Sequence, residues 1–257
     1  MGRALKLHLG GVYAFLYLPI AVLIVLSFNK GGLPTAWTGF SFDWYGQLLA
    51  NPKILAAALN SLIVALAATL ISTAIGTLLA LGVATAKHSA ARDALLFVPM
   101  IIPDIVLAIA LLAFFTLSKV TLGLHSIIAA HVVFDIAFVC AVVRARLSSF
   151  DWSLTEVSRD LGAGVWDTFW KVTFPLIRPS VIAAALLAFT LSIDEFIIAY
   201  FTAGAGQSST TLPMQIYAMI RFGVTPEINA MATLVLLLSF VLVFAAQRVD
   251  RGRIPGA

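Results

Sequence analysis

The sequence predicts an all-α integral membrane protein with six transmembrane helices and both termini in the cytoplasm. Hydrophobic residues make up 61% of the 257 positions, and the mean hydropathy is +1.03. Only 11% of the residues are charged, whereas a typical soluble domain has about 25%. A soluble fold cannot bury this much apolar surface, so a lipid bilayer is the expected solvent for most of the chain.

Six apolar stretches approach or exceed the length of about 20 residues that a helix needs to cross the hydrocarbon core. They cover residues 11–28, 59–85, 94–117, 126–143, 180–203 and 230–247. The first stretch follows Arg3 and Lys6 and could imitate a signal peptide, but no A-x-A-like cleavage site comes after it. We therefore interpret it as a retained first span.

Lysine and arginine residues between the spans predict the orientation. Twelve of them lie in the N-terminal segment, the loops after spans two and four, and the C-terminal segment, and four lie in the other three loops. Because cytoplasmic segments carry the excess of Lys and Arg, the first group is expected in the cytoplasm. An odd number of spans would mix the two groups, so this asymmetry also supports six spans.

Two longer segments are expected on the outer side. Residues 29–58 form the first, and their aromatic side chains fit an interfacial belt. The second, residues 204–229, contains apolar residues at helical spacing and is expected to form a short amphipathic helix. These apolar residues are Leu212, Ile216, Met219 and Ile220.

Several motifs that carry chemistry are absent from the sequence. No G-x-x-x-x-G-K-[ST], H-E-x-x-H, C-x-x-C or G-x-S-x-G occurs. The four histidines are scattered, so no metal site is expected, and the single Cys140 excludes an intrachain disulfide. The basic residues flank apolar runs, which does not suggest nucleic acid. We expect no enzymatic activity in this chain, so energy for any work must come from a gradient or from a partner.

A patterned polar segment separates spans four and five on the cytoplasmic side. Ser153 and Glu156 have the spacing of a capping box, which predicts a short helix over residues 154–161. Gly162 can end this helix in the left-handed conformation. A second short helix is expected over residues 165–173, before two prolines mark the entry to span five.

Apolar residues of this segment recur three or four positions apart and form one stripe. They are Leu154, Val157, Leu161, Val165 and Phe169, with Trp166 and Trp170 widening the stripe. Two interpretations follow. The stripe packs against the protein's own helix ends, with Glu156 only a cap, or it docks a cytoplasmic partner.

The same segment resembles the cytoplasmic motif of permease subunits in binding-protein-dependent ABC importers, which reads E-A-A, three residues, G, nine residues, I-x-L-P. Glu156, Gly162 and Pro175 match at the correct spacing. The motif's two alanines are replaced by Val157 and Ser158, and its Ile and Leu by Val172 and Phe174. The motif also lies in the expected loop, between the fourth and fifth of six spans.

This resemblance implies a type I ABC importer permease fold over roughly residues 55–247, with coupling helices at about 153–174 that seat on an ATPase. Residues 1–54 would form an N-terminal span with its outer loop, and 248–257 a cytoplasmic tail. The implied ATPase-coupling residues are Glu156, Val157, Ser158, Gly162, Ala163, Val172 and Pro175.

The resemblance also implies partners and cofactors. A second permease subunit of a different sequence, a solute-binding protein on the outer side and an ATPase dimer would complete the transporter in the inner membrane. ATP and Mg²⁺ would bind to the ATPase and not to this chain. The phrases "LSIDEFIIAYFTAG" and "TLPMQIYAMIRFGVTPEINAMATL" further resemble the spermidine/putrescine permease branch, especially its C-type subunit.

Ionisable residues at membrane depth are candidates for a substrate path. They are Asp104, Asp135, Asp194 and Glu195, with His131 one helical turn before Asp135. No Lys or Arg lies in the middle of a span, so such a path favours a cationic solute. In the other interpretation, these acids are protonated or hydrogen-bonded between helices, for example in a His131–Asp135 pair.

Three other functions are weighed against a polyamine importer. An ABC permease for iron, a phosphonate or another small cation would share the coupling motif. A gradient-driven carrier would need no such motif and should show internal symmetry, which the sequence lacks. An intramembrane enzyme would need a nucleophile and a base at suitable spacing, and none is present.

Overall fold

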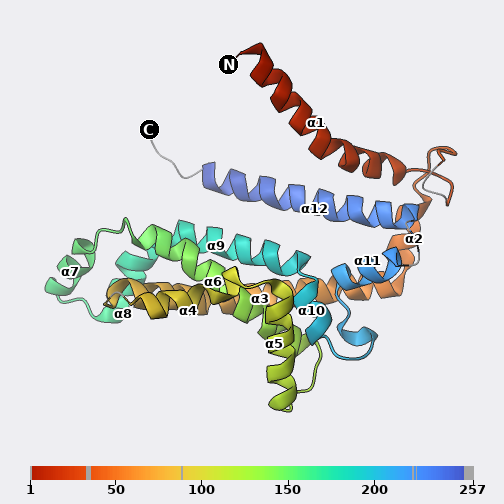
Figure 1. The fold of residues 1–257 in the computed structure, drawn as a ribbon. Helices are drawn as coiled ribbons and strands as arrows, with labels where there is room; N and C mark the ends of the chain where they lie inside the picture. The colour runs from red at the N-terminus through yellow and green to blue at the C-terminus, as the bar shows by residue number, and fades with distance from the viewer. Residues whose placement is uncertain (1, 33–35, 88, 222, 224, 252–257) are drawn as a thin grey trace. The chain divides into compact units, whose positions relative to one another are not determined.

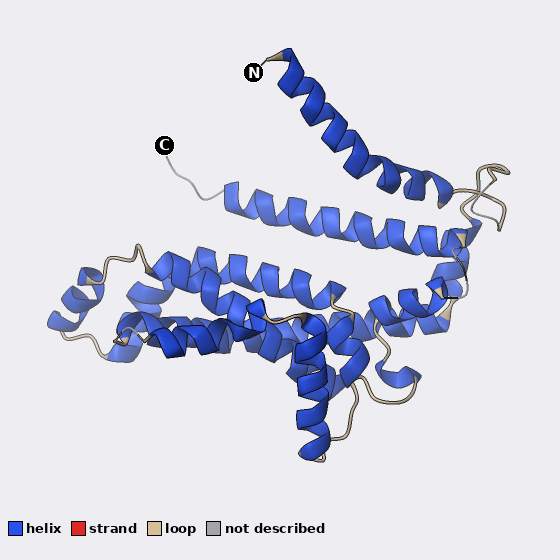
Figure 2. Ribbon diagram, in the orientation of Figure 1, coloured by secondary structure: helices blue, strands red, loops and turns tan. Residues whose placement is uncertain are grey.

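The computed structural model describes residues 2–32, 36–87, 89–221, 223 and 225–251 (Figure 1). Within these ranges the chain consists of helices and connecting loops, without a regular strand (Figure 2). The chain divides into two units, Met1–Ala56 with Gln215–Ala257, and Ala57–Met214. Residues 252–257, most of the expected tail 248–257, lie outside the described residues.

The first unit contains two long apolar helices, α1 (Arg3–Leu26) and α12 (Pro226–Arg251), and the short helix α2 (Asp43–Ala50). α12 packs against both α1 and α2. The side chains of α1 are almost all exposed in this chain. An apolar helix of 24 residues with an exposed surface fits a lipid environment.

The outer segment 29–58 is folded more specifically than an aromatic belt requires. The buried Asn29 side chain donates to the carbonyl of Ala36 at 2.8 Å and accepts from the amide of Thr38 at 2.9 Å. Trp44 donates its indole N–H to the Asn29 carbonyl at 2.8 Å. The rings of Phe28, Phe40, Phe42 and Tyr45 pack against one another. These contacts tie the loop to the end of α1.

The second unit holds most of the remaining helices. In chain order they are α3 (Pro52–Thr85), α4 (Ala90–Ile101), α5 (Asp104–Leu117), α6 (Leu124–Leu147), α7 (Ser153–Asp160), α8 (Val165–Thr168), the π-helix η1 (Phe169–Thr173), α9 (Phe174–Asp194), α10 (Ile197–Thr202) and the 3₁₀ turn η2 (Gln207–Ser209), with α11 (Leu212–Ile220) crossing the boundary between the units. α6 is the central helix, because it packs against α4, α5, α9 and α10.

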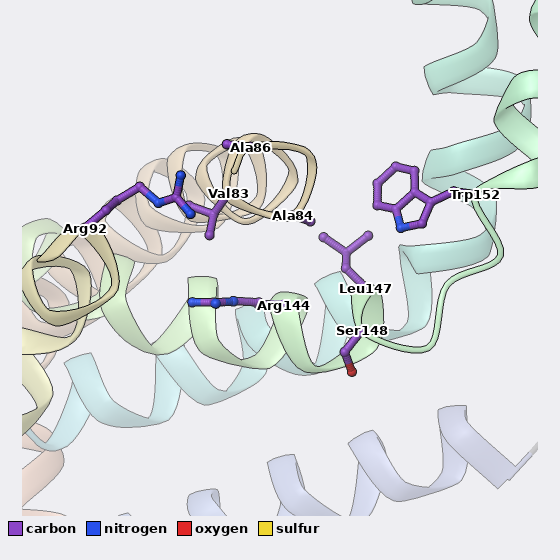
Figure 3. Close-up of a pocket in the computed structure, with 8 residues that line it drawn as sticks. All are labelled: Val83, Ala84, Ala86, Arg92, Arg144, Leu147, Ser148 and Trp152. Carbon is purple, nitrogen blue, oxygen red and sulfur yellow. The ribbon is translucent and has the colours of Figure 1, made fainter. Parts of the chain in front are cut away.

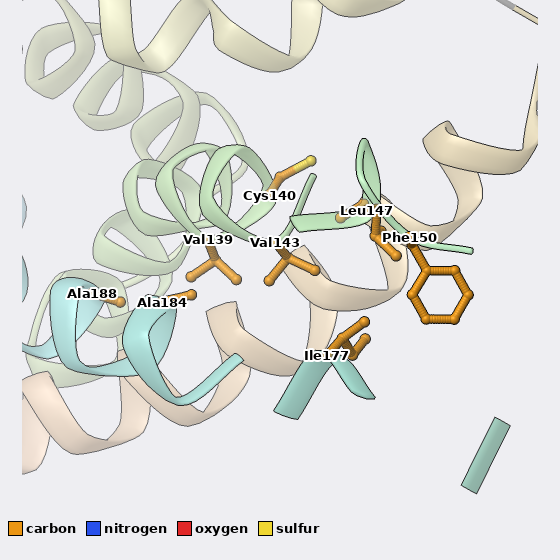
Figure 4. Packing of buried hydrophobic residues seen from close by; sticks show 9 residues of the cluster. Val139, Cys140, Val143, Leu147, Phe150, Ile177, Ala184 and Ala188 are labelled. Carbon is orange, nitrogen blue, oxygen red and sulfur yellow. The ribbon is translucent and has the colours of Figure 1, made fainter. Parts of the chain in front are cut away.

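Small side chains let the helices of the second unit approach closely, as is common in membrane proteins. Val139 and Cys140 of α6 meet Ala184 and Ala188 of α9 in one buried cluster (Figure 4). A Cβ atom added at Gly76 of α3 would lie 2.7 Å from the Val139 side chain. α3 therefore contacts α6 at a position that only glycine allows.

Four helices are long and apolar enough to cross a membrane: Ala4–Leu26, Pro52–Thr85, Leu124–Leu147 and Val165–Asp194. α4 and α5 form a fifth candidate if they are counted as one span, although they are bent by 104° at the break. The described apolar part of α12, Pro226–Phe240, is shorter. The all-helical membrane class is confirmed. The count of six spans is consistent with these helices and stays a prediction.

The third span is broken sharply at Pro103. α4 ends at Ile101, and α5 starts at Asp104 after Pro103, in a sharply different direction. The fifth span also differs from the expected continuous run 180–203, because α9 ends at Asp194 and α10 starts at Ile197. The expected helix at 204–229 is confirmed as α11.

Candidate functional site

The start of α7 is stabilised by Asp151, so the predicted capping box is wrong. Residue 152 is the N-cap and has helical dihedral angles, and its side chain makes no capping hydrogen bond. Ser153 donates both its amide (3.0 Å) and its hydroxyl (2.7 Å) to Oδ1 of Asp151. These two hydrogen bonds favour the charged carboxylate and lower the pKa of Asp151 below its ordinary value.

Gly162 ends α7 as the sequence predicts. Its φ angle of +86° is in the left-handed region that glycine reaches without steric cost. The amide of Gly162 donates to the carbonyl of Arg159 at 2.9 Å, and the amide of Ala163 donates to that of Ser158 at 3.1 Å. This pair of bonds is a Schellman motif, which satisfies the last carbonyls of the helix. A hydrogen bond of 3.1 Å between the hydroxyls of Ser158 and Thr168 then links α7 to α8.

The second helix of this segment was predicted to be separate from span five, but the two are continuous. α8 runs into the π-helix Phe169–Thr173 and then directly into α9. Pro175 lies in the first turn of α9 and Pro179 inside it. Pro175 has no N–H to donate to a carbonyl of the preceding turn, and the widened π-helical turn lies at that place. The polar segment and the membrane span therefore share one continuous helical backbone.

The apolar stripe of α7 and α8 is exposed in this chain. Leu161 is 83% exposed, Val165 71% and Trp166 72%. Trp166, Phe169, Trp170 and Phe174 pack ring against ring along one side of the helix. Exposed apolar surface outside the expected membrane spans indicates a binding surface. Of the two interpretations of the stripe, the structure favours docking over packing on the chain's own helix ends.

A cavity of about 520 Å³ lies between this segment and the end of α3. Glu156 and Arg159 of α7 line one side, and Gly82 and Thr85 of α3 line the other. The Glu156 carboxylate is exposed, and among the described residues it has no hydrogen-bond or ion-pair partner. It is therefore available to a group outside this chain.

The second candidate region surrounds the break between α9 and α10. Oε1 of Glu195 accepts from the amide of Ile198 and Oε2 from that of Ala199, each at 3.0 Å, so this carboxylate caps α10. His131 of α6 is buried; its Nδ1 lies 2.7 Å from Oγ of Ser192, and its Nε2 lies 3.7 Å from Oε2 of Glu195. These contacts join α6 to the break.

The His131–Asp135 pair of the alternative interpretation is not formed. His131 turns toward α9 instead, to Ser192 and Glu195. Asp135 is fully buried on α6, and neither of its carboxylate oxygens has a hydrogen-bond partner among the described residues. Ser192 was not a candidate from the sequence, because a serine in an apolar helix gives no signal of its partner.

The remaining two acids lie at helix breaks and are exposed. Asp104 is the first residue of α5, and Asp194 is the last residue of α9. α5 and α10 pack together through Leu107, Leu111 and Ile198. The described residues contain no group of three or more His, Cys, Asp or Glu side chains that could hold a metal ion.

Comparisons with known proteins agree on one family. Residues 72–254 match the family model described as "Binding-protein-dependent transport system inner membrane component". The "Spermidine/putrescine transport system permease protein PotC" of Escherichia coli K12 is 40% identical over 262 residues, covering 100% of this chain and 97% of that protein. The "Putrescine transport system permease protein PotI" of the same organism is 36% identical, covering 94% of this chain and 90% of that protein.

Solved structures share the fold at lower sequence identity. A bacterial ABC transporter that imports alginate aligns with a TM-score of 0.79 at 16% identity, covering 98% of this chain and 96% of that one. The MetNI methionine ABC transporter aligns with a TM-score of 0.62 at 18% identity, covering 84% and 100%. These likenesses show the fold.

Proposed function

We propose that this chain, which belongs to the family of binding-protein-dependent transport system inner membrane components, is the permease subunit of an ATP-driven importer of polyamines. The observation that carries the proposal is the exposed apolar segment α7–α8, which continues without a loop into the membrane helix α9. A docking surface built onto a span is what a permease needs to receive movement from an external ATPase. The 40% identity to a spermidine/putrescine permease over the whole chain supports polyamines as the solute.

The coupling function is assigned to Glu156, Val157, Ser158, Gly162, Ala163, Val172 and Pro175. Gly162 and Ala163 form the Schellman turn that presents Leu161 and Val165 to a partner. Ser158 fixes α7 on α8 through Thr168, and Pro175 begins the continuous α9. In this proposal, ATP and Mg²⁺ bind to a separate ATPase dimer. Closure of that dimer moves the coupling segment of this chain and that of the second permease subunit toward each other.

The substrate path is assigned first to Asp194 and Asp104. Both carboxylates are exposed in this chain, and both lie where a helix is interrupted, as is common in binding sites at membrane depth. Each could pair with an ammonium group of a passing polyamine. Glu195 already accepts two backbone N–H groups, so we assign it to holding the α9–α10 break rather than to direct contact. Asp135 is fully buried on α6, so we do not assign it to direct contact either.

The remaining partners follow from the same proposal. A second permease of different sequence would complete the path, and a solute-binding protein would deliver the polyamine from the outer side. The solved alginate transporter in complex with its periplasmic protein is an example of such delivery for another solute. Residues 1–54 would add a peripheral span, and residues 55–247 would form the transmembrane domain with the coupling helices.

Uptake of labelled putrescine and spermidine by cells that lack their own polyamine importers tests the proposal. Cells that express this chain with its neighbouring subunits should accumulate polyamine only when ATP is available. The ion gradients are then dissipated while ATP is maintained. Uptake should continue if the importer is driven by ATP, and it should stop if the protein is a gradient-driven carrier. Uptake of iron or a phosphonate without uptake of polyamine would leave the coupling proposal standing and refute the substrate.

Co-purification tests the coupling segment separately. Glu156→Ala should reduce the amount of ATPase retained on the tagged permease. Asp160→Ala should retain it, because Asp160 is exposed on the same helix and lies at one of the three unspecified positions of the motif. Equal retention of the ATPase by the two variants would refute the role assigned to Glu156.

A further inference from the structure

A second cavity lies where α3 ends, α4 begins and α6 ends, and it shares Ala84 and Trp152 with the cavity beside α7. Its volume is about 330 Å³, at the lower end of the range of about 300–1,000 Å³ that is usual for ligand pockets. Figure 3 shows the residues that line it. They are Val83, Ala84, Ala86, Arg92, Arg144, Leu147, Ser148 and Trp152.

Two arginines give this cavity its charge. Arg92 belongs to the first turn of α4 and Arg144 to the last turn of α6, and their guanidinium groups lie on the same side of the cavity (Figure 3). Nη2 of Arg144 donates to Oδ2 of Asp93 at 2.9 Å, and Nε of Arg92 lies 3.8 Å from Oδ1 of the same carboxylate. Two guanidinium groups against one carboxylate leave a net positive charge at the cavity.

The Arg144 guanidinium group is held in place, and both arginines keep free donors. Arg144 lies over the ring of Phe97, with 5.8 Å from its Cζ to the ring centroid, so packing and the bond to Asp93 fix its orientation. A guanidinium group has five N–H donors, and the described contacts of Arg144 use one of them. Arg92 contributes a buried Nε without a hydrogen-bond acceptor. An oriented Arg144 with unused donors, beside the unused donor of Arg92, matches a phosphate group, which binds guanidinium forks through two oxygens.

The rest of the lining is divided between polar and apolar groups. The indole N–H of Trp152 adds a polar donor, and Val83, Ala84 and Leu147 form an apolar wall. The Ser148 hydroxyl already donates to the carbonyl of Ala145 at 2.8 Å, so it offers the cavity only an acceptor. The N-terminus of α4, which has a partial positive charge, lies beside the cavity, because Arg92 of its first turn is one of the lining residues. An anionic group attached to an apolar body fits both parts of the lining.

The position of the cavity along the helices suggests the source of that anion. Lys87 and Arg92 follow span two and Arg144 ends span four, so the charge pattern puts the cavity at the cytoplasmic surface of the membrane. Basic pockets between helices on this side bind anionic lipid headgroups. We propose that this cavity is a binding site for a phosphate ester, supplied by the headgroup of an anionic phospholipid. The proposal depends on the membrane orientation and is independent of the transported solute.

Native mass spectrometry of the complete complex, purified with its partner subunits, tests this site. Phosphatidylglycerol is added to the wild type and to each variant, and phosphatidylcholine serves as a lipid without net charge. Arg92→Gln should bind phosphatidylglycerol about tenfold more weakly, which corresponds to about 1.4 kcal/mol. Ser148→Leu should do the same by filling the cavity without changing its charge. Arg146→Gln is the control, because Arg146 is exposed on α6, two residues after Arg144, and does not line the cavity.

A second measurement distinguishes a lipid from a soluble phosphate ester. Glycerol 3-phosphate is added to the wild type, and its effect on the melting temperature is compared with that in Arg92→Gln. Stabilisation of the wild type alone, without selective phosphatidylglycerol binding, would assign the site to a soluble ligand and overturn the lipid source. If Arg92→Gln and Ser148→Leu bind phosphatidylglycerol as tightly as Arg146→Gln, and glycerol 3-phosphate affects Arg92→Gln and the wild type alike, the two arginines only lock α4 to α6 and the proposed site does not exist.

Discussion

Replacing Gly162 with alanine isolates the contribution of one turn to coupling. The residue has φ +86°, and a Cβ atom added there would meet no neighbouring heavy atom within 4 Å. The cost of the substitution therefore comes from the backbone conformation and not from a steric clash. Gly164 is the matched control, because it is two residues away, has φ −67° and has equally free space around its Cβ position.

The size of the effect follows from the left-handed conformation. A non-glycine residue pays about 1–2 kcal/mol to adopt it. If the ATPase binds only the segment with an intact turn, this cost lowers the affinity for the ATPase by about 5–30-fold, at about 1.4 kcal/mol per factor of ten. The global stability of the membrane helices should change little, because α7 and α8 form the exposed end of the unit.

Titration of the purified ATPase onto the permease in nanodiscs measures this affinity directly. Gly162→Ala should shift the midpoint by about 5–30-fold relative to the wild type, and Gly164→Ala should leave it nearly unchanged. If the two variants bind alike, or if Gly162→Ala unfolds the membrane helices along with the turn, the reasoning from the Schellman motif is refuted.

Three other perturbations test the remaining parts of the structure. Asp194→Asn should reduce polyamine uptake at least about tenfold while the complex still assembles; wild-type uptake would remove Asp194 from the path. Gly76→Leu should destabilise the helix packing by about 1–3 kcal/mol, because the leucine side chain must displace Val139. Gly82→Leu on the same helix should not, because no heavy atom lies within 4 Å of its Cβ position. Thermal melting of the two variants in detergent measures the difference. The pKa of Asp151 is lowered in the folded chain, so its stabilisation of the start of α7 is present above the ordinary carboxyl pKa and is lost as the pH falls through the lowered value. The affinity for the ATPase should therefore weaken in acid. Asp151→Asn should remove this pH dependence.

Features set by local sequence were predicted well. The apolar runs gave the long helices α1, α3 and α6, because a span requires only length and hydrophobicity. Gly162 gave the end of α7, since few other residues adopt a positive φ at low cost. The amphipathic spacing at 212–220 likewise predicted α11.

Features that depend on competing partners were not predicted. Ser153 had a suitable glutamate three residues later, but Asp151, two residues earlier, accepts both of its donors. His131 and Asp135 share one helix face by their spacing, yet Ser192 lies closer to the imidazole across the helix interface. Sequence spacing describes neighbours on one helix and contains no information about the helix that packs against it.

The bend between α4 and α5 has the same explanation. Pro103 shows where a helix can break, but the angle of 104° depends on the packing of α5 against α10. The joining of α8 to α9 was missed for a related reason: Pro175 favoured a new helix start, and the π-helical turn before it keeps the backbone continuous instead.

The helix from Val165 to Asp194 is continuous, so tilting one end of it displaces the other end. Its 30 residues span about 45 Å at 1.5 Å per residue, whereas the hydrocarbon core is about 30 Å thick. About a third of the helix can therefore extend beyond the membrane with Trp166 near its tip. Tilting a rod of this length by about 10° around its Trp166 end moves the Asp194 end by about 8 Å, and tilting it around the Asp194 end moves the Trp166 end equally. A small rotation at the ATPase would thus reach the acidic break at Asp194 as a movement of the whole rod rather than being absorbed in a flexible loop.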